Sequence, residues 1–223
     1  MMTQTQQAVE TARFNMIEQQ IRTWEVLDPK VLALLDEVPR EDFVNEAQRG
    51  LAFADVELPI GYGQTMLSPK LEGRILQAMQ VKKTDKVLLV GTGGGYLAAL
   101  LAKQAQHVFA VDIIPELSAL TSQRLAQHHI NNVTIVVADA ANGYAVAAPY
   151  DVIVFTGALN LHPTEAEKML KVGGRMFAVV GDAPIMQAIL TQRMSEGACR
   201  KEVLFETCLP LLDNAPQASK FEF

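Results

Sequence analysis

Three glycines at alternate positions, Gly91, Gly93 and Gly95, follow directly after the apolar run of residues 87–90. Glycine adopts the positive φ angles of a tight turn and lets a ligand approach the backbone closely. Residues 96–102 then predict a helix with one apolar face. Free N–H groups at such a helix N-terminus bind a phosphate or a carboxylate. The stretch therefore predicts a buried strand, a ligand-binding turn and a helix.

Acidic residues follow the next two predicted strands. Residues 107–111 lead into Asp112, whose carboxylate can accept hydrogen bonds from both hydroxyls of a ribose, and residues 133–137 lead to Asp139. Ligands bind at the carboxyl ends of the strands in an open α/β sheet, so these acids and the glycine turn share one nucleoside site. The constellation resembles class I S-adenosylmethionine-dependent methyltransferases. Tyr96 stands where a dinucleotide fingerprint has its last glycine, which disfavours a nicotinamide cofactor.

The composition limits the class of protein. A chain of 223 residues with 49% hydrophobic content can bury one large core and a small appendage. A net charge of −6 and a pI near 5.3 disfavour nucleic acid as a partner. Cys199 and Cys208 have neither zinc-site nor redox-motif spacing, so no metal is expected. No apolar run reaches membrane-spanning length and no signal peptide is evident, so we expect a cytoplasmic protein without membrane association.

The first fifty residues predict a helical extension. Phe14, Ile17, Ile21 and Trp24 recur at helical spacing and predict one apolar stripe, with the two aromatic side chains in the core. Within residues 28–38, an Asp-Pro pair opens a second helix, because aspartate caps a helix and proline fits its first turn. Residues 1–50 are therefore expected to pack on the main domain as one layer.

A change of character begins at residue 51. Residues 51–69 carry prolines and glycines without a sustained period, which predicts a long irregular loop. Such a loop next to a ligand site is typically functional, and we expect residues 57–69 to form an active-site loop. Ser68 and Pro69 then start a helix that leads to the glycine turn.

The later chain completes the sheet. Residues 152–155 predict a fourth strand with Thr156 at its carboxyl end, residues 175–181 a fifth, and residues 201–212 the last strands in an antiparallel edge. The expected fold is α/β: a doubly wound, mostly parallel, seven-stranded Rossmann-like methyltransferase sheet with helices on both faces and the N-terminal helical extension. The methyltransferase domain is expected to span residues 51–212. Residues 213–223, polar apart from Phe221 and Phe223, are either a free tail or one docked across a dimer contact.

Successive segments identify a closer resemblance. VPREDFV, LPIGYGQT and VLLVGTGGGY resemble consecutive signatures of protein-L-isoaspartate O-methyltransferases, and the likeness continues through HVFAVD, NVTIVVAD, PYDVIVFTGA and KVGGRMFAVVG. It extends from Phe14 to Pro210. Methyltransferases that act on nucleobases carry an acidic or amide residue, two prolines and an aromatic where this chain has FTGA, which disfavours that class.

The resemblance implies methyl transfer from S-adenosyl-L-methionine to the free carboxylate of isoaspartyl residues in damaged proteins, with S-adenosyl-L-homocysteine as product. A carboxylate is ionised at neutral pH, so the enzyme needs no general base and works by positioning. Isoaspartyl peptides are the implied partners, and the chain is a monomer or a homodimer. The resemblance implies donor binding by Gly91, Thr92, Gly93, Gly95, Tyr96, Asp112, Ile113, Asp139 and Ala140. Gln64, Thr65, Ser68 and Thr156 are the candidates for the reacting centre.

This chain departs from the family pattern in the active-site loop. The family usually reads Gln-Thr-Ile-Ser, whereas this chain reads Gln64-Thr65-Met66-Leu67 with Ser68 one place late. Ser68 either replaces the missing hydroxyl or only caps the following helix. Asp139-Ala140 and Thr156-Gly157 likewise replace Asp-Gly and Thr-Ala. Two alternatives stay open: a relative that methylates another carboxylate or small molecule, and a non-catalytic donor-binding interaction module.

Overall fold

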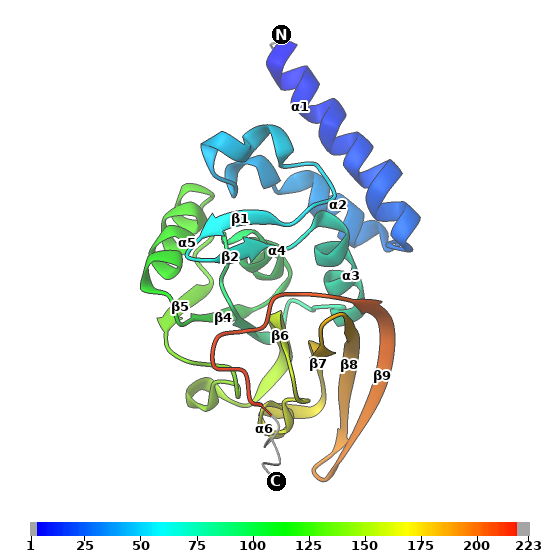
Figure 1. The fold of residues 1–223 in the computed structure, drawn as a ribbon, viewed down its shortest axis with the longest axis vertical. Helices are drawn as coiled ribbons and strands as arrows, with labels where there is room; N and C mark the ends of the chain where they lie inside the picture. Colours follow the sequence, from blue (N-terminus) through cyan, green and yellow to red (C-terminus); the bar gives the residue numbers. More distant parts are fainter. Residues whose placement is uncertain (1–3, 218–223) are drawn as a thin grey trace.

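The computed structural model describes residues 4–217, and in this part of the chain seven strands form one sheet (Figure 1). The strand order is β5-β4-β3-β6-β7-β8-β9. The first five in this order are parallel, whereas β8 runs antiparallel to both its neighbours. The strands are β3 (Lys86–Val90), β4 (His107–Asp112), β5 (Val133–Val137), β6 (Tyr150–Leu159), β7 (Leu170–Asp182), β8 (Ile185–Ser195) and β9 (Ala198–Thr207). The predicted fold class, a mostly parallel seven-stranded α/β sheet, is confirmed.

The strand order reverses between β3 and β6. From β3 the chain proceeds outward through β4 to β5, and then returns to place β6 on the other side of β3. Val87 of β3 therefore pairs with Val108 of β4 on one side and with Val152 of β6 on the other. Such a switch point leaves a crevice at the carboxyl ends of the strands, where α/β proteins bind ligands.

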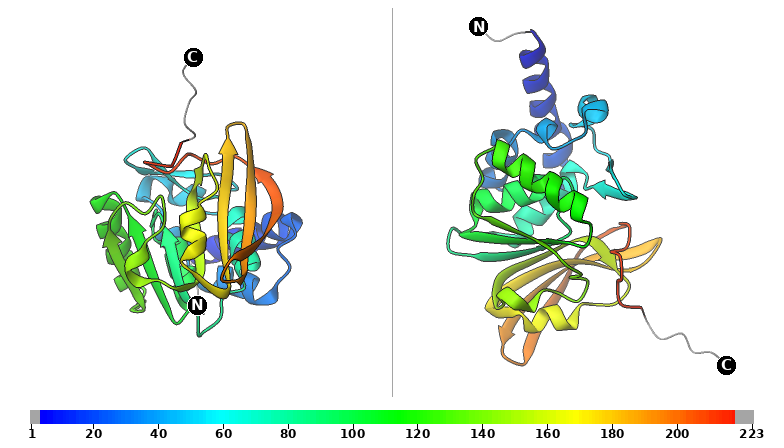
Figure 2. Two further views of the ribbon diagram at one scale, coloured as in Figure 1. Left: turned by 90° about the horizontal axis from the view of Figure 1, so that it is seen from below. Right: turned by 90° about the vertical axis from the view of Figure 1, so that its left-hand side faces the viewer.

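Helices cover both faces of the sheet unequally. Among the described residues, α2, α3, α4 and α5 pack with the extension on one face, whereas α6 lies on the other (Figure 2). Alternate residues of β3 serve the two cores: Val87 and Leu89 face the first, and Leu88 and Val90 the second. The helices are α2 (Pro29–Glu37), α3 (Pro69–Met79), α4 (Tyr96–Gln104), α5 (Pro115–Gln127) and α6 (Thr164–Lys168), with 3-10 turns η3 (Arg40–Asp42), η4 (Glu46–Leu51) and η5 (Ala145–Ala147).

The N-terminal helix is long and stands off the body of the protein (Figure 1). It comprises α1 (Gln4–Asn15), the π-helical η1 (Met16–Ile21) and the 3-10 turn η2 (Arg22–Trp24). Ile17 and Ile21 are buried as predicted, but Phe14 is 61% exposed and Trp24 is 42% exposed. The prediction that this aromatic pair lies in the core is wrong. Phe14 lies on α1, before the turns that pack against α3, and the Trp24 ring contacts Nζ of Lys70, 4.2 Å from its centroid.

Two later predictions also need correction. Residues 57–69 are not irregular: β1 (Leu58–Gly61) and β2 (Gln64–Met66) form an antiparallel hairpin whose turn residues, Tyr62 and Gly63, both have positive φ. Residues 201–212 hold only the second half of β9, and the sequence analysis missed β8. Burial along β8 does not alternate regularly, because the neighbouring residues Ile189 and Leu190 are both half-buried, and this hides the period-2 signal.

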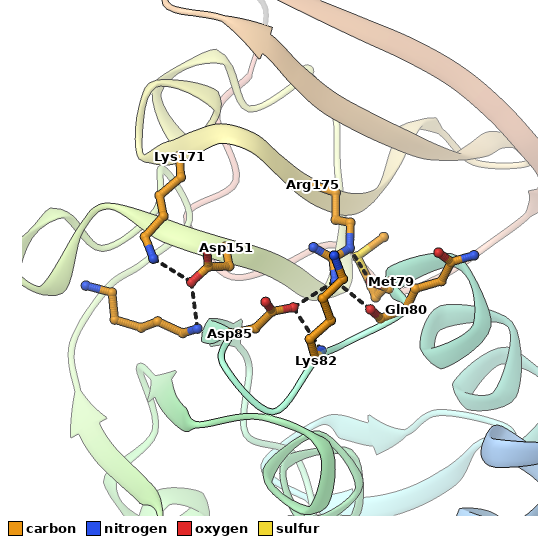
Figure 3. Close-up of polar contacts among 8 residues, drawn as sticks. Met79, Gln80, Lys82, Asp85, Asp151, Lys171 and Arg175 are labelled. Atoms are coloured by element: carbon orange, nitrogen blue, oxygen red, sulfur yellow. Dashed lines mark hydrogen bonds and ion pairs between the residues drawn. The ribbon is translucent and has the colours of Figure 1, made fainter.

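A polar network fixes the amino-terminal edge of the sheet, opposite the crevice (Figure 3). Oδ2 of Asp151 accepts hydrogen bonds from the Lys86 amide at 2.8 Å and from Nζ of Lys171 at 2.7 Å. Nη2 of Arg175 donates to Oδ2 of Asp85 at 2.8 Å. Because these side chains come from β6, β7 and the turn before β3, they hold the three strands in register.

Candidate active site

A cavity lies at the carboxyl edge of the sheet, at the switch point between β3 and β6. Its floor is the glycine turn after β3, and the ends of β4, β5 and β6 form its sides. The hairpin β1–β2 and residues 210–213 complete the wall. The predicted residues that line it are Gln64, Thr65, Gly91, Gly93, Asp112, Ile113, Asp139, Ala140 and Thr156.

The glycine turn is packed too tightly to accept side chains at two positions. Gly91 has a φ of +88°, and a Cβ there would lie 2.1 Å from Oγ1 of Thr156. A Cβ on Gly94 would lie 2.8 Å from the carbonyl oxygen of Phe43 in the extension. Nη1 of the buried Arg124 donates to the Phe43 carbonyl at 2.7 Å and to the Gly94 carbonyl at 2.8 Å. Sequence reasoning missed Arg124, since an arginine within an amphipathic helix carries no distinguishing signal.

Asp112 is held in a fixed orientation at the end of β4. Its Oδ2 accepts hydrogen bonds from the Thr92 amide at 2.7 Å and from Oγ1 of Thr92 at 2.8 Å, while Oδ1 accepts from the Ile114 amide at 2.9 Å. Each carboxylate oxygen has two lone-pair sites, so Oδ1 retains capacity for a further donor. Asp112 therefore joins the glycine turn to the adjacent strand end and faces the cavity as an acceptor.

The C-terminal segment crosses the sheet edge above this floor (Figure 1). The Ala158 amide donates to the Pro210 carbonyl at 2.8 Å, and the Leu212 amide donates to the Ala158 carbonyl at 2.9 Å. The Leu212 side chain packs on Gly157, where a Cβ would lie 2.8 Å from it.

Two side-chain contacts continue this crossing. Nε2 of Gln64 donates to Asp213 at 3.3 Å, and Nδ2 of Asn214 donates to Asp139 at 3.0 Å. Residues 213–215 are therefore held against the cavity wall and are not part of a free tail. Phe221 and Phe223 lie outside the described residues.

The candidates for the reacting centre divide into two groups. Gln64, Thr65 and Thr156 line the cavity, although Thr156 also donates its hydroxyl to the Val90 and Gly91 carbonyls at 3.0 and 3.2 Å. Ser68 does not line it. This residue lies on a separate cavity between α3 and β9, and it is the N-cap of α3, where its side chain makes no capping hydrogen bond.

Leu67 lines the cavity instead of Ser68, because β2 ends at Met66 and the chain turns into α3 there. Three of the predicted donor-binding residues also lie away from the main cavity. Thr92 and Tyr96 line a smaller adjoining cavity beneath the hairpin. Gly95 is the N-cap of α4 and packs against Thr121.

A buried ion pair supports the hairpin from below. Nη1 of Arg40 contacts Oε2 of Glu72, and both side chains are about 98% or more enclosed. Nη2 of Arg40 also donates to the Leu67 carbonyl at 2.6 Å, and Nε donates to the Ala52 carbonyl at 2.9 Å. Burial raises the pKa of Glu72 to about 7, although the Arg40 guanidinium opposes that rise. The sequence analysis assigned neither residue a role, since nothing local pairs positions 32 apart.

The described residues, 4–217, contain neither a metal-binding cluster nor a membrane-spanning helix. Histidine, cysteine and acidic side chains form no group of three or more that could hold a metal ion. In the same part of the chain, every helix is too short or too polar to span a membrane. Cys199 is half-buried, Cys208 is exposed, and both are free thiols.

The sheet order, the glycine turn at the switch point and the acidic residues at neighbouring strand ends together define an α/β methyltransferase. A model of the protein-L-isoaspartate(D-aspartate) O-methyltransferase family matches residues 11–214. The chain belongs to that family, and the resemblance expected from the sequence is confirmed.

Named relatives are similar over most of their length. A protein-L-isoaspartate O-methyltransferase of Ignicoccus hospitalis is 39% identical over 188 residues, which cover 82% of this chain and 89% of the relative. One from Koribacter versatilis is 38% identical over 204 residues, covering 91% of each chain. One from Picosynechococcus is 41% identical over 169 residues, covering 76% of each.

Solved structures agree on the fold. One protein-L-isoaspartate O-methyltransferase superposes with a TM-score of 0.77 at 22% identity, covering 89% of this chain and 65% of that chain. Another, described as a protein-L-isoaspartate O-methyltransferase from Plasmodium falciparum in complex with S-adenosyl-L-homocysteine, gives a TM-score of 0.74 at 16% identity. It covers 89% of this chain and 96% of that chain.

Proposed function

We propose that the cavity at the carboxyl edge of the sheet binds S-adenosylmethionine and that the hairpin β1–β2 presents an isoaspartyl carboxylate to it. The reaction is the one that defines the family: transfer of a methyl group to the free carboxylate of an isoaspartyl residue in a damaged protein. The observation that carries the assignment is the convergence of Gly91, Asp112 and Asp139, from three strand ends, on one cavity.

The residues present fit the donor. Gly93 lines the cavity, and a Cβ there would meet no atom closer than Ile60 Cδ1 at 3.8 Å, so the bare backbone of the turn leaves room for a ligand in direct contact with it. Asp112 keeps a free acceptor site toward the cavity, suited to ribose hydroxyls. Apolar side chains beside Asp139, including Ile113 and Leu117, suit an adenine ring. The donor supplies an electrophilic methyl group on a sulfonium.

The chain's own contribution is to bind and orient the acceptor. An isoaspartyl carboxylate is already ionised near neutral pH, so no side chain has to remove a proton. Gln64 and Thr65 lie on the hairpin strand that faces the glycine turn, and Thr156 faces them from β6. Holding two reacting groups in line in this way is worth about 7–11 kcal/mol in intramolecular systems. Residues 210–213 complete the wall that keeps water from the reacting atoms.

The departure at Leu67 bears on substrate choice. Because Leu67 lines the cavity and Ser68 lies outside it, this chain presents an apolar side chain where the family usually has a hydroxyl. That observation favours, as a second candidate, a methyltransferase that acts on a different carboxylate or small molecule. In both cases the donor and the reaction type are the same.

One assay separates the candidates. Purified protein is incubated with S-adenosylmethionine labelled in the methyl group and with an isoaspartyl peptide, beside the same peptide containing normal aspartate. We expect base-labile label in the isoaspartyl peptide alone. Donor binding with no transfer to that peptide would contradict the isoaspartyl assignment and leave the second candidate. The proposed partner is an isoaspartyl peptide, and the proposed assembly is a monomer or a homodimer.

A further inference from the structure

Beneath the hairpin, a cavity of about 20 Å³ lies between the active-site loop and the glycine turn. A cavity of this size holds one group as large as a water molecule, for which about 10–15 Å³ is needed. Thr65, Leu67, Gly91, Gly93 and Thr156 line both this space and the main cavity, so the two cavities adjoin.

Glu72 lines the small cavity from α3. The residue is 1% exposed, and its Oε2 contacts Nη1 of Arg40. Among the described residues, no hydrogen bond reaches Oε1. This oxygen also keeps some accessible surface, because it is absent from the fully enclosed side-chain atoms that lack a partner. Oε1 therefore faces the cavity with its acceptor sites free. A half-satisfied buried carboxylate is costly to keep, which points to a ligand that completes it.

The charges around Glu72 are few. Arg40 of η3 is its direct partner, and the Tyr96 phenol of α4 lies beside the pair. Arg13 and Glu41 of the extension form their own ion pair at 2.6 Å. Both charges are close enough to the Tyr96 phenol to affect its pKa, in opposite directions. The charges at this point are therefore the Arg40 guanidinium and the Glu72 carboxylate itself. One further cation at Oε1 would be stabilised at that carboxylate.

The amino-acid end of S-adenosylmethionine carries an ammonium group, which donates up to three hydrogen bonds and is bound more strongly by a carboxylate than by a neutral acceptor. The acidic residues of the main cavity already have partners: Asp112 accepts three hydrogen bonds and its remaining site is assigned above to the ribose, Asp139 accepts from Ala141 and Asn214, and Asp213 accepts from Gln64. Residues 86–90 before the glycine turn include no acidic residue. Glu72 is the carboxylate that lines the small cavity together with residues 91–94 of the turn.

We propose, on the basis of the donor binding proposed above, that Glu72 binds the α-ammonium group of S-adenosylmethionine through Oε1. Arg40 holds Oε2 and so fixes the carboxylate toward the cavity. The same arginine holds the Leu67 carbonyl, which couples the donor's amino-acid end to the backbone of the active-site loop. A positive charge at Oε1 favours the ionised form of Glu72 and opposes the rise of its pKa to about 7.

The test is a double-mutant-type cycle, in which one change removes the ammonium group from the ligand and the other removes the charge of Glu72 from the protein. Affinities of S-adenosylhomocysteine and of its deaminated analogue are measured by calorimetry on the wild-type protein and on Glu72→Gln. A hydrogen bond to a charged group is worth about 1.5–3 kcal/mol, so we expect S-adenosylhomocysteine to bind about 10- to 100-fold more weakly to Glu72→Gln. The deaminated analogue is expected to change less than about twofold.

Two further variants control for folding. Glu41→Gln removes the charge from another buried, arginine-paired glutamate that lines none of these cavities, and it should leave both affinities unchanged. Glu72→Asp keeps the charge beside Arg40 but shortens the side chain, and it should weaken binding of the amino ligand selectively. If Glu72→Gln does not fold, Glu72→Asp supplies the same comparison.

Equal loss of both ligands in the Glu72 variants, or loss of neither, would overturn the proposal. Wild-type protein that binds both ligands equally would overturn it as well, while leaving the proposed function intact. Wild-type protein that binds neither ligand would overturn the donor assignment itself. The readout is binding, so the result does not depend on the identity of the methyl acceptor.

Discussion

Nη2 of Arg40 donates a 2.6 Å hydrogen bond to the backbone carbonyl of Leu67. This bond joins the N-terminal extension to the active-site loop across 27 positions of sequence. The same guanidinium contacts Glu72 of α3 and the Ala52 carbonyl, so three separate segments converge on one buried side chain. The extension is therefore part of the active-site scaffold.

Replacement of Arg40 by lysine should destabilise the protein. Lysine keeps the charge but lacks the fork that serves three acceptors, so at least one buried acceptor loses its partner. We expect the free energy of unfolding to fall by about 1.5–3 kcal/mol, measured by urea denaturation. The matched control is Arg49→Lys, whose exposed pair with Asp42 should change stability by less than about 0.5 kcal/mol. Equal effects of the two variants would contradict the scaffold role.

Asp112→Ala should weaken donor binding. Its carboxylate faces the cavity and positions Thr92 of the glycine turn, so its removal costs both a ligand contact and the fixed turn. We expect affinity for S-adenosylhomocysteine to fall by about 10- to 100-fold in calorimetry, the equivalent of one or two charged hydrogen bonds. Asp182→Ala is the control, because Asp182 also ends a parallel strand but does not line the cavity. Unchanged affinity in Asp112→Ala would refute the ribose assignment.

Leu67→Ser should alter the acceptor step without altering donor affinity. Leu67 lines the cavity, so a serine there places a hydroxyl beside the reacting centre. One neutral hydrogen bond is worth about 0.5–1.5 kcal/mol, which predicts about a 2- to 10-fold higher kcat/KM for an isoaspartyl peptide. Ser68→Ala is the control and should leave kcat/KM unchanged, since Ser68 lies on the separate cavity. A larger effect from Ser68→Ala would reverse these assignments.

Asp151 should make stability depend on pH in the acid range. Burial raises the pKa of Asp151, but hydrogen bonds from Lys171 and the Lys86 amide lower it by more (Figure 3). The pKa of Asp151 in the folded protein is therefore below its usual value. Between its folded pKa and the unfolded value of about 3.9, the unfolded state binds more protons than the folded state. The stabilisation is therefore complete above the unfolded pKa and is lost as the pH falls through the folded pKa.

The corresponding experiment compares wild type with Asp151→Asn by denaturation between pH 2 and pH 7. The stability difference should be largest above pH 4 and should shrink toward pH 2. Lys171→Met is the control, because it removes the larger hydrogen-bonding cause and should move the pKa of Asp151 upward in a carboxyl titration by NMR. A difference that is the same at both ends of the pH range would contradict the shift.

Much of the sheet was predictable from local pattern. The bounds of β5 and the end of β4 at Asp112 agree with the sequence analysis, because short apolar runs closed by polar residues are a strong signal for buried parallel strands. The helix that starts at Asp28 and Pro29 is also confirmed, and the Asp28 carboxylate accepts from the Lys30 amide as a cap. These features depend on neighbours within a few residues.

Other features were hidden because their cause lies far away in sequence. The exposure of Phe14 depends on how far α1 extends beyond α3, and that of Trp24 on its contact with Lys70, and periodicity reports neither. The hairpin in residues 57–69 carries too few residues per strand for an alternating pattern to be visible. The free acceptor on Glu72 depends on Arg40 and on the loop above it, so no window around residue 72 contains the signal.

By itself, the sequence determined the parallel strands, the glycine turn and the acidic residues at two strand ends, since all of these are encoded in short apolar runs and the polar or glycine residues that end them. Only the tertiary structure decided which of the loop residues reaches the cavity, that Leu67 and not Ser68 does so, and that residues 210–213 close the wall. Those outcomes follow from the packing of segments more than 20 residues apart in the sequence. Which arrangement forms depends on the desolvation of a charge or the fit of one side chain, and a local sequence pattern reports neither.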